Sequence, residues 1–185
     1  LQVHCGVPQF GTIRLDAPYT ELMSGIGDLS WFNEDMDGDG QADSSKVFWQ
    51  DSSLVAPLGV AIIDNTILVS QPPSLIAITD VNRNDKFDDE DTKEILLTGF
   101  EGLDHDHSLH SVTVGPNGQY YFNTGNAGNA DVESPDLHLY TGTWYLDRTD
   151  RAKKSSDGHQ YVGGTAMRMN PCLLYTSDAA DEEDS

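Results

Sequence analysis

Hydrophobic residues in this chain occur in short runs separated by turn-forming residues. Residues 59–63 and 66–70 are two β-branched runs around Asp64-Asn65, a dipeptide that tolerates the positive φ of a tight turn. Residues 111–114 and 119–122 flank Gly115-Pro-Asn-Gly118, in which proline and glycine suit the turn dihedrals. Both patterns predict β-hairpins.

Further short apolar runs predict additional strands at 29–32, 75–78, 94–97, 139–140 and 144–145. No segment keeps apolar residues at helical spacing for more than one turn. Many short strands with Gly, Pro and Asn turns indicate an all-β fold, of the sandwich, barrel or propeller type.

An internal repeat favours the propeller. Two acidic segments, 35–43 and 80–88, share one pattern at a distance of about 45 residues, the spacing of propeller blades. An apolar strand precedes each segment, and another follows it. We therefore expect a partial β-propeller of about three to four blades, forming an open arc with calcium-binding loops between strands.

The two acidic segments place oxygen donors at alternate positions, as a calcium loop does with side chains and a main-chain carbonyl at position 7. The first offers Asp35, Asp37, Asp39, the carbonyl of Gln41, and Asp43. The second offers Asp80, Asn82, Asn84, the carbonyl of Lys86, and Asp88. Position 12 of the first loop is Lys46, so the bidentate glutamate of an EF-hand is absent. These are predicted as strand-connecting calcium loops, with solvated acidic turns as the alternative.

Charge narrows the classes of partner. The 185 residues carry 31 Asp and Glu against 10 Lys and Arg, a formal net charge of −21. Nucleic acids and anionic membrane surfaces require an excess of basic residues, so neither is expected as a partner. No apolar run approaches the roughly 20 residues of a transmembrane helix.

The last residues differ in character from the rest. Residues 172–185 resemble the translation of a sequencing adapter, so we expect a non-native tail there and a domain over 1–171. Without the five carboxylates of this tail, the net charge changes from −21 to −16 and remains strongly acidic. Cys5 is then the one remaining cysteine, so cysteine usage does not identify a compartment.

Three of the six histidines lie within residues 105–110. A neutral imidazole can accept a proton from a substrate hydroxyl, and a carboxylate such as Asp104 or Asp106 can orient the ring. Zinc binding is an alternative, although no fourth ligand stands at a diagnostic spacing. A polar surface loop without chemistry is the other alternative.

Several motifs together resemble the bacterial membrane-bound dehydrogenase β-propellers, distant relatives of the quinoprotein glucose and sorbosone dehydrogenases. The resemblance covers residues 25–171. It rests on the motifs Asp35 to Asp43 with Ser45-Lys-Val-Phe48, Thr98-Gly-Phe100, Leu109-His-Ser111 with Gly115 to Gly125, Val132-Glu-Ser-Pro135 and Gly163 to Pro171.

This resemblance implies a sugar or alcohol dehydrogenase that is periplasmic, secreted or membrane-associated and that uses Ca²⁺ and pyrroloquinoline quinone. In the glucose dehydrogenases the catalytic histidine stands eight residues before the glycine of the Gly-Pro-Asx-Gly turn, which corresponds to His107 here. His107 is then the candidate general base, with His110 and Asp104 beside it in the sequence. Leu109 and His110 replace the small glycines of the relatives, and the cationic residues that hold the quinone would follow Pro171.

A function from a different class is also consistent with the sequence. A non-catalytic propeller could bind glycan or protein on its loop face, since a fold does not determine a function.

Overall fold

A computed structural model gives the fold. It describes residues 2–5, 29–34, 37, 44–52, 54, 57–102, 107–134, 137–145, 147 and 149–171. The strands are β1 (Gln2–Cys5), β2 (Leu29–Glu34), β3 (Ser44–Gln50), β4 (Gly59–Ile63), β5 (Thr66–Gln71), β6 (Ser74–Thr79), β7 (Thr92–Thr98), β8 (Phe100–Gly102), β9 (Leu109–Val114), β10 (Tyr120–Thr124), β11 (Gly128–Ser134), β12 (Leu137–Gly142), β13 (Tyr161–Val162) and β14 (Ala166–Met169). No α-helix occurs in this part of the chain, which confirms the predicted all-β class.

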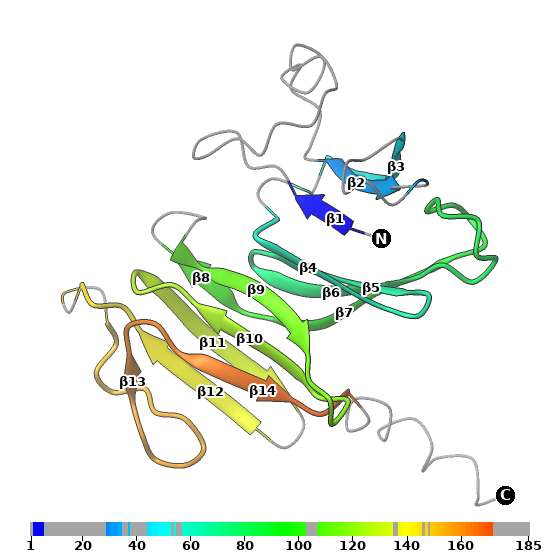
Figure 1. Cartoon of the computed structure of the whole chain (residues 1–185). Coiled ribbons are helices and arrows are strands. Elements are labelled where there is room, and N and C mark those ends of the chain that lie inside the picture. The colour runs from blue at the N-terminus through cyan, green and yellow to red at the C-terminus, as the bar shows by residue number, and fades with distance from the viewer. Residues whose placement is uncertain are drawn as a thin grey trace, which may run out of the picture.

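The strands form four sheets, as Figure 1 shows. Two are consecutive, with the orders β1-β2-β3 and β4-β5-β6-β7. The other two are interleaved in the sequence, with the orders β14-β10-β9 and β13-β12-β11-β8. Neighbouring strands are antiparallel except β12 and β13, which are parallel. In the described ranges, no helix has the length and apolar character needed to cross a bilayer.

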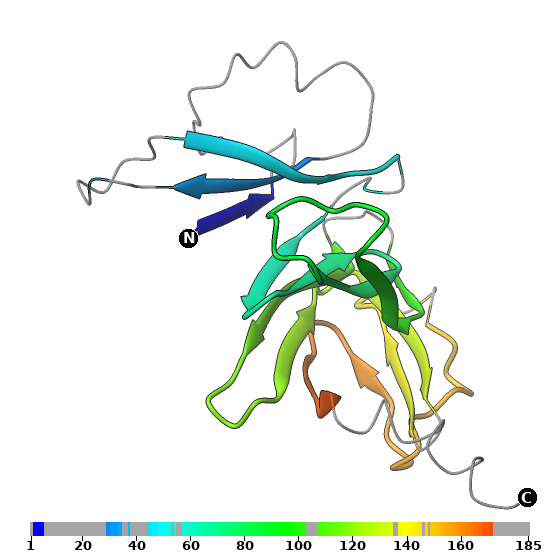
Figure 2. The same cartoon turned by 90° about the vertical axis from the view of Figure 1, so that its right-hand side faces the viewer.

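The β4–β7 sheet is an antiparallel meander with apolar side chains on both faces. Because successive side chains of a strand point to opposite faces, an almost continuous apolar run can serve two cores. On β6, Leu75 and Ala77 belong to one core, while Ile76 and Ile78 belong to the other. This sheet therefore lies between two layers (Figure 2).

The first core joins the meander to β3. Phe48 and Trp49 of β3 pack with buried side chains of β5 and β6, and Leu54 completes the cluster. The ring of Phe87, from the loop after β6, lies edge-on to Trp49 at 5.9 Å between centroids.

The second core lies where three sheets meet. Leu68 of the meander, Leu109 and Phe122 of the β9–β10 hairpin, and Val132 of β11 all contribute to it. Phe100 of β8 is 1% exposed and meets Phe122 in a T-shaped contact at 5.9 Å. One side of the meander is thus covered by strands from both interleaved sheets.

Several local predictions are confirmed. Both expected hairpins form, with Asp64 at φ +53° and Gly118 at φ +75° in their turns. The two acidic segments follow β2 and β6 and precede β3 and β7, which pair with their predecessors. The expectation of a strand at Trp144-Tyr145 is wrong, because β12 ends at Gly142 and both aromatic residues are exposed beyond it.

A segment over residues 150–160 is fastened to β11 and β12 by polar contacts. The Oγ atoms of Ser155 and Ser156 accept hydrogen bonds from the main-chain N–H groups of Tyr140 and His138. Asp131 of β11 accepts hydrogen bonds from His138 Nε2, at 2.6 Å, and from Lys153 Nζ. These two contacts, the one from His138 first, lower the pKa of Asp131 below its ordinary value of 3.8.

Replacing Asp131 with asparagine should destabilise the protein at pH 7 by less than about 1 kcal/mol, because the side chains are partly exposed. A lowered native pKa means that the carboxylate stabilises the fold above its unfolded-state pKa, near 4, and that this contribution disappears as pH falls through the native pKa. Thermal melts of wild type and Asp131→Asn should therefore converge in acid. Glu133→Gln, an exposed change on the same strand, is the control. A difference that persists unchanged to pH 2 would contradict the assignment.

Candidate functional site

The second acidic loop connects β6 to β7 and spans positions 1 to 12 of a calcium-type loop, from Asp80 to Asp91. Asp85, at position 6, has φ +60°, where EF-hand loops place glycine for a sharp turn. Asp80 is 5% exposed although it is a carboxylate. The chain therefore turns inside the loop and draws its first acidic side chain inward.

Hydrogen bonds connect the acidic and amide side chains of this loop to its main chain and to one another. Asp80 Oδ1 and Oδ2 accept from the main-chain N–H groups of residues 84 and 85, at 3.2 and 3.0 Å. The amide nitrogens of Asn82 and Asn84 both donate to the Asp88 carboxylate. The pKa of Asp88 is lowered, first by the N–H of Glu90 and then by Asn84. The predicted donor side chains thus converge on one another.

Two contacts attach the loop, one to another turn of its own sheet and one to the β1–β3 sheet. Arg83 donates to both carboxylate oxygens of Asp64, at 3.0 and 2.6 Å, which holds the loop against the β4–β5 turn. This ion pair lowers the pKa of Asp64 and raises that of Arg83. On the other side, the N–H of Phe87 donates to the carbonyl of Phe48 in β3 at 2.9 Å. The loop therefore bridges the β1–β3 sheet and the meander.

This loop can hold a hard cation only if its amide and main-chain oxygens act as ligands beside its carboxylates. In the described ranges no group of three Asp, Glu, His or Cys side chains is placed to hold a metal ion. Asparagine and main-chain oxygens would have to complete the coordination, as they commonly do for calcium. The sequence analysis missed Asp91, whose position 12 in the loop was the available signal. Asp91 now accepts hydrogen bonds from the N–H groups of Val81 and Asp88.

The first acidic loop falls mostly outside the described residues. Asp35, Asp39, Gln41 and Asp43 lie outside them, and Asp37 is described and exposed. The structure therefore leaves the metal prediction for this loop as a prediction.

His107 lies just before β9, against a turn that contains two glycines. A Cβ on Gly125 would come within 2.7 Å of the His107 carbonyl oxygen, and one on Gly128 would clash with the same atom. The N–H of Gly125 donates to the Ser108 carbonyl at 2.9 Å, and Ser108 Oγ donates to the Phe100 carbonyl at 3.0 Å. These close contacts between main-chain segments fix the position of His107 just before β9.

His110 stands at an irregularity of β9. Leu109 pairs with Thr124 and Val112 with Phe122, so two residues of β9 face one residue of β10. Such bulges redirect side chains and are frequent beside active sites. Asp104, the predicted orienting carboxylate, lies outside the described residues. Of the three predicted catalytic residues, His107 therefore lies just before β9 and His110 lies at the bulge of β9.

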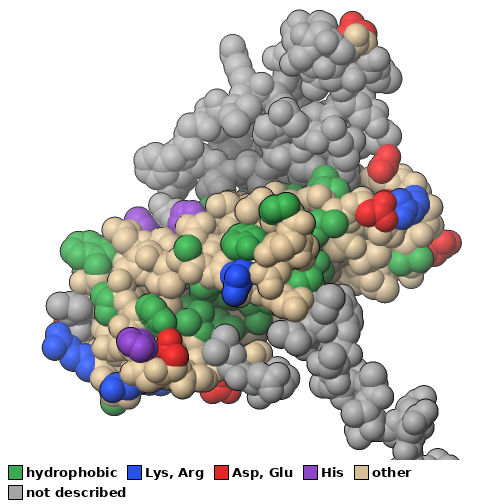
Figure 3. Space-filling model, turned by 60° about the horizontal axis from the view of Figure 1, so that its bottom comes forward, with side chains coloured by type: hydrophobic (Ala, Val, Ile, Leu, Met, Phe, Trp, Pro, Cys, Tyr) green, Lys and Arg blue, Asp and Glu red, His purple; other side chains and the backbone are tan. Residues whose placement is uncertain are grey.

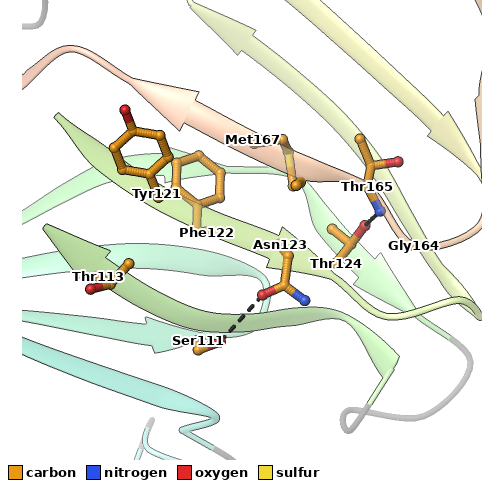
Figure 4. A pocket seen from close by; sticks show the side chains of 10 residues that line it. Ser111, Thr113, Tyr121, Phe122, Asn123, Thr124, Gly164, Thr165 and Met167 are labelled. Carbon is orange, nitrogen blue, oxygen red and sulfur yellow. Dashed lines mark hydrogen bonds between the residues drawn. The ribbon is translucent and has the colours of Figure 1, made fainter. Parts of the chain in front are cut away.

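A shallow hollow lies on the β9–β10–β14 sheet, apart from these histidines. It has a volume of about 520 Å³, and neither His107 nor His110 lines it. Figure 4 shows its polar side chains, with Ser111 Oγ donating to Asn123 Oδ1 at 3.2 Å and Thr165 N donating to Thr124 Oγ1 at 3.3 Å. The lining surface is mostly apolar, with Tyr121, Phe122 and Met167 as its larger side chains, and hydroxyl groups and the Asn123 amide add polar atoms.

Comparison with known protein families gives a match for most of this chain. A family described as a domain of unknown function (DUF7133) matches residues 19–167, which include both acidic loops, His107 and strands β2 to β13. The chain belongs to the DUF7133 family. No curated protein and no solved structure matches it. The DUF7133 match ends before residues 172–185, the predicted non-native tail, which also lie outside the described residues.

Proposed function

We propose that this DUF7133 domain is an arc of a β-propeller. Three of its sheets are in the order expected of successive blades, since the meander packs on β3 through one face and on β9 and β10 through the other. The β4–β7 meander has the four antiparallel strands of one blade. The β11–β13 strands are an insertion between the second and third strands of the next blade, β10 and β14.

Calcium is the proposed structural ion of this arc. The observation that supports it is the folded loop from Asp80 to Asp91, whose side chains at positions 1, 3, 5, 9 and 12 are held by hydrogen bonds within the loop and which bridges two sheets. Binding would replace the bonds from the Asn82 and Asn84 amides to Asp88 with bonds from side-chain oxygens to the ion. By the sequence pattern, the first loop, with Asp37, is a second site.

The proposed activity is oxidation of a sugar or alcohol hydroxyl in a periplasmic or secreted protein, with His107 as general base. The observation that supports this activity is the position of His107 just before β9. Close contacts with a glycine turn fix this position. The substrate loses a proton from its hydroxyl to the imidazole and a hydride from the adjacent carbon to an oxidant. The contacts given above for His107 are with the main chain of the glycine turn and include no basic side chain, so pyrroloquinoline quinone as the oxidant rests on the family resemblance alone.

His107→Gln should lower sugar-dependent reduction of a redox dye by about 100-fold or more, the usual effect of losing a general base. The assay uses the full chain with calcium and added pyrroloquinoline quinone. His159→Gln, an exposed histidine distant in sequence, is the matched control and should retain activity. If wild type reduces no dye with any sugar or alcohol, or if His107→Gln is as active as wild type, the enzymatic proposal is wrong.

The second candidate is a non-catalytic propeller that binds glycan. The observation that favours it is the hollow on the β9–β10–β14 sheet, where the apolar surface of residues such as Tyr121 and Met167 lies beside hydroxyl groups and the Asn123 amide, a combination that suits the C–H faces and hydroxyls of a sugar. Binding of a sugar without turnover would support this candidate over the first.

A further inference from the structure

Several loops converge at the end of the molecule where His107 lies. The glycine turn 125–128 contacts the His107 backbone on one side. On its other side, the carbonyl of Asn126 accepts a hydrogen bond from the N–H of Trp144 at 3.2 Å. The turn thus connects the candidate base with the segment that follows β12. Figure 3 shows one face of the molecule, on which hydrophobic and histidine side chains both reach the surface.

Trp144 and Tyr145 form an exposed aromatic pair. Their side chains are 51% and 38% exposed, and their ring centroids lie 3.9 Å apart with 33° between the planes. Large aromatic side chains normally bury most of their surface, so an exposed and mutually stacked pair indicates an interaction site.

The backbone beneath this pair is firmly held. Thr143 is completely buried, and its Oγ1 accepts a hydrogen bond from the N–H of Tyr145 at 3.3 Å. Thr149, which is also buried, donates through Oγ1 to the Thr143 carbonyl at 2.9 Å. Together with the Trp144–Asn126 bond, these contacts fix the main chain on both sides of the rings. The main chain that carries the pair is preorganised, which reduces the entropy lost when a ligand binds.

We propose that the Trp144–Tyr145 pair is a stacking platform for a neutral saccharide, beside the loop that carries His107. This rests on the proposed sugar class, which the dehydrogenase and the glycan-binding candidates share. One face of a pyranose ring is largely C–H, and it can lie on an indole ring while the hydroxyls remain in water. The net charge of −21 disfavours polyanions such as nucleic acids, whose bases also stack on aromatic rings.

Saturation-transfer NMR on the full chain tests the platform directly. The probes are D-glucose, D-galactose, D-mannose, D-xylose and cellobiose. At least one should receive saturation through its ring C–H protons, and Trp144→Ala should weaken its apparent Kd by about threefold to tenfold, the range for one aromatic contact. Trp144→Phe should retain part of the affinity. Ile95→Ala, which truncates an exposed hydrophobic side chain on β7, should leave it unchanged.

His107→Gln separates this inference from the proposed activity. If it abolishes turnover but keeps sugar binding, both proposals are supported. Sugar binding that depends on Trp144 in a protein without turnover supports the platform and contradicts the enzyme. Turnover with no effect of Trp144→Ala on Kd or KM contradicts the platform alone. Absence of saturation transfer from every probe overturns the platform, as does a dimer in size-exclusion chromatography that Trp144→Ala dissociates, because the pair would then bind a second copy.

Discussion

Replacing Phe100 with alanine is expected to lower the free energy of unfolding by about 3–5 kcal/mol, the usual cost of removing a buried phenylalanine ring. Phe100 is 1% exposed in the core where three sheets meet, and its ring contacts that of Phe122. Its main chain also receives the hydrogen bond from Ser108, next to His107. The cavity would therefore loosen the packing between sheets rather than within one of them.

Urea denaturation of wild type and Phe100→Ala measures this difference through the midpoint at constant m-value. Ile95→Ala removes a side chain that is 61% exposed and should change stability by less than about 0.5 kcal/mol. A loss below about 1 kcal/mol in Phe100→Ala would mean that the three sheets do not share one core.

Adding calcium is expected to raise the melting temperature by about 5–10 °C relative to the protein in chelator. A cation that binds the folded state alone adds about 2.7 kcal/mol at a hundredfold excess over its Kd, and a domain of this size gains about 2–4 °C per kcal/mol. The physical reason is the repulsion among the carboxylates of the loop from Asp80 to Asp91, which the ion would neutralise. Scanning calorimetry with CaCl₂ and with EDTA measures the shift.

Variants of the second loop test whether the calcium-induced rise in melting temperature comes from this loop. Asp80→Asn and Asp91→Asn, at positions 1 and 12, should each reduce the calcium-induced shift. Asp89→Asn removes the same charge at position 10, which supplies no oxygen to the site, and should keep the shift. Comparing shifts removes the intrinsic cost of each substitution. Equal melting temperatures with and without calcium, or equal losses in Asp89→Asn and Asp91→Asn, would contradict the site.

Local chemistry made part of this fold predictable. Hairpins over residues 59–70 and 111–122 followed from β-branched runs around turn residues, because turn dihedrals depend on a few neighbouring residues. The second acidic loop could be placed for the same reason, since its donors are close in sequence. Counting one loop to position 12 would also have found Asp91. The position of His107 came from the family resemblance, and the structure adds the glycine contacts that hold it.

Packing between residues far apart in the sequence determined the features of the fold that local patterns did not predict. Strand β11 (Gly128–Ser134) is polar and contains glycine and asparagine, so its pattern did not predict a strand, yet Ala130 and Val132 are buried in the shared core. Trp144 and Tyr145 have strong strand propensity, but hydrogen bonds from their main-chain N–H groups to the Asn126 carbonyl and to Thr143 Oγ1 hold them in an exposed loop. Propensity is weak where tertiary contacts compete with it.

By itself the sequence determined the all-β class, two hairpins, the acidic loops between paired strands and the sign of the charge, since each depends on composition or on residues close together in the chain. The tertiary structure was needed to show that β10 pairs with β14 although three strands, β11 to β13, lie between them in the sequence, and that three sheets enclose Phe100. It alone brought the segment at Trp144 to the turn beside His107. These arrangements join residues far apart in sequence, and their stability comes from burying surfaces that no local pattern specifies.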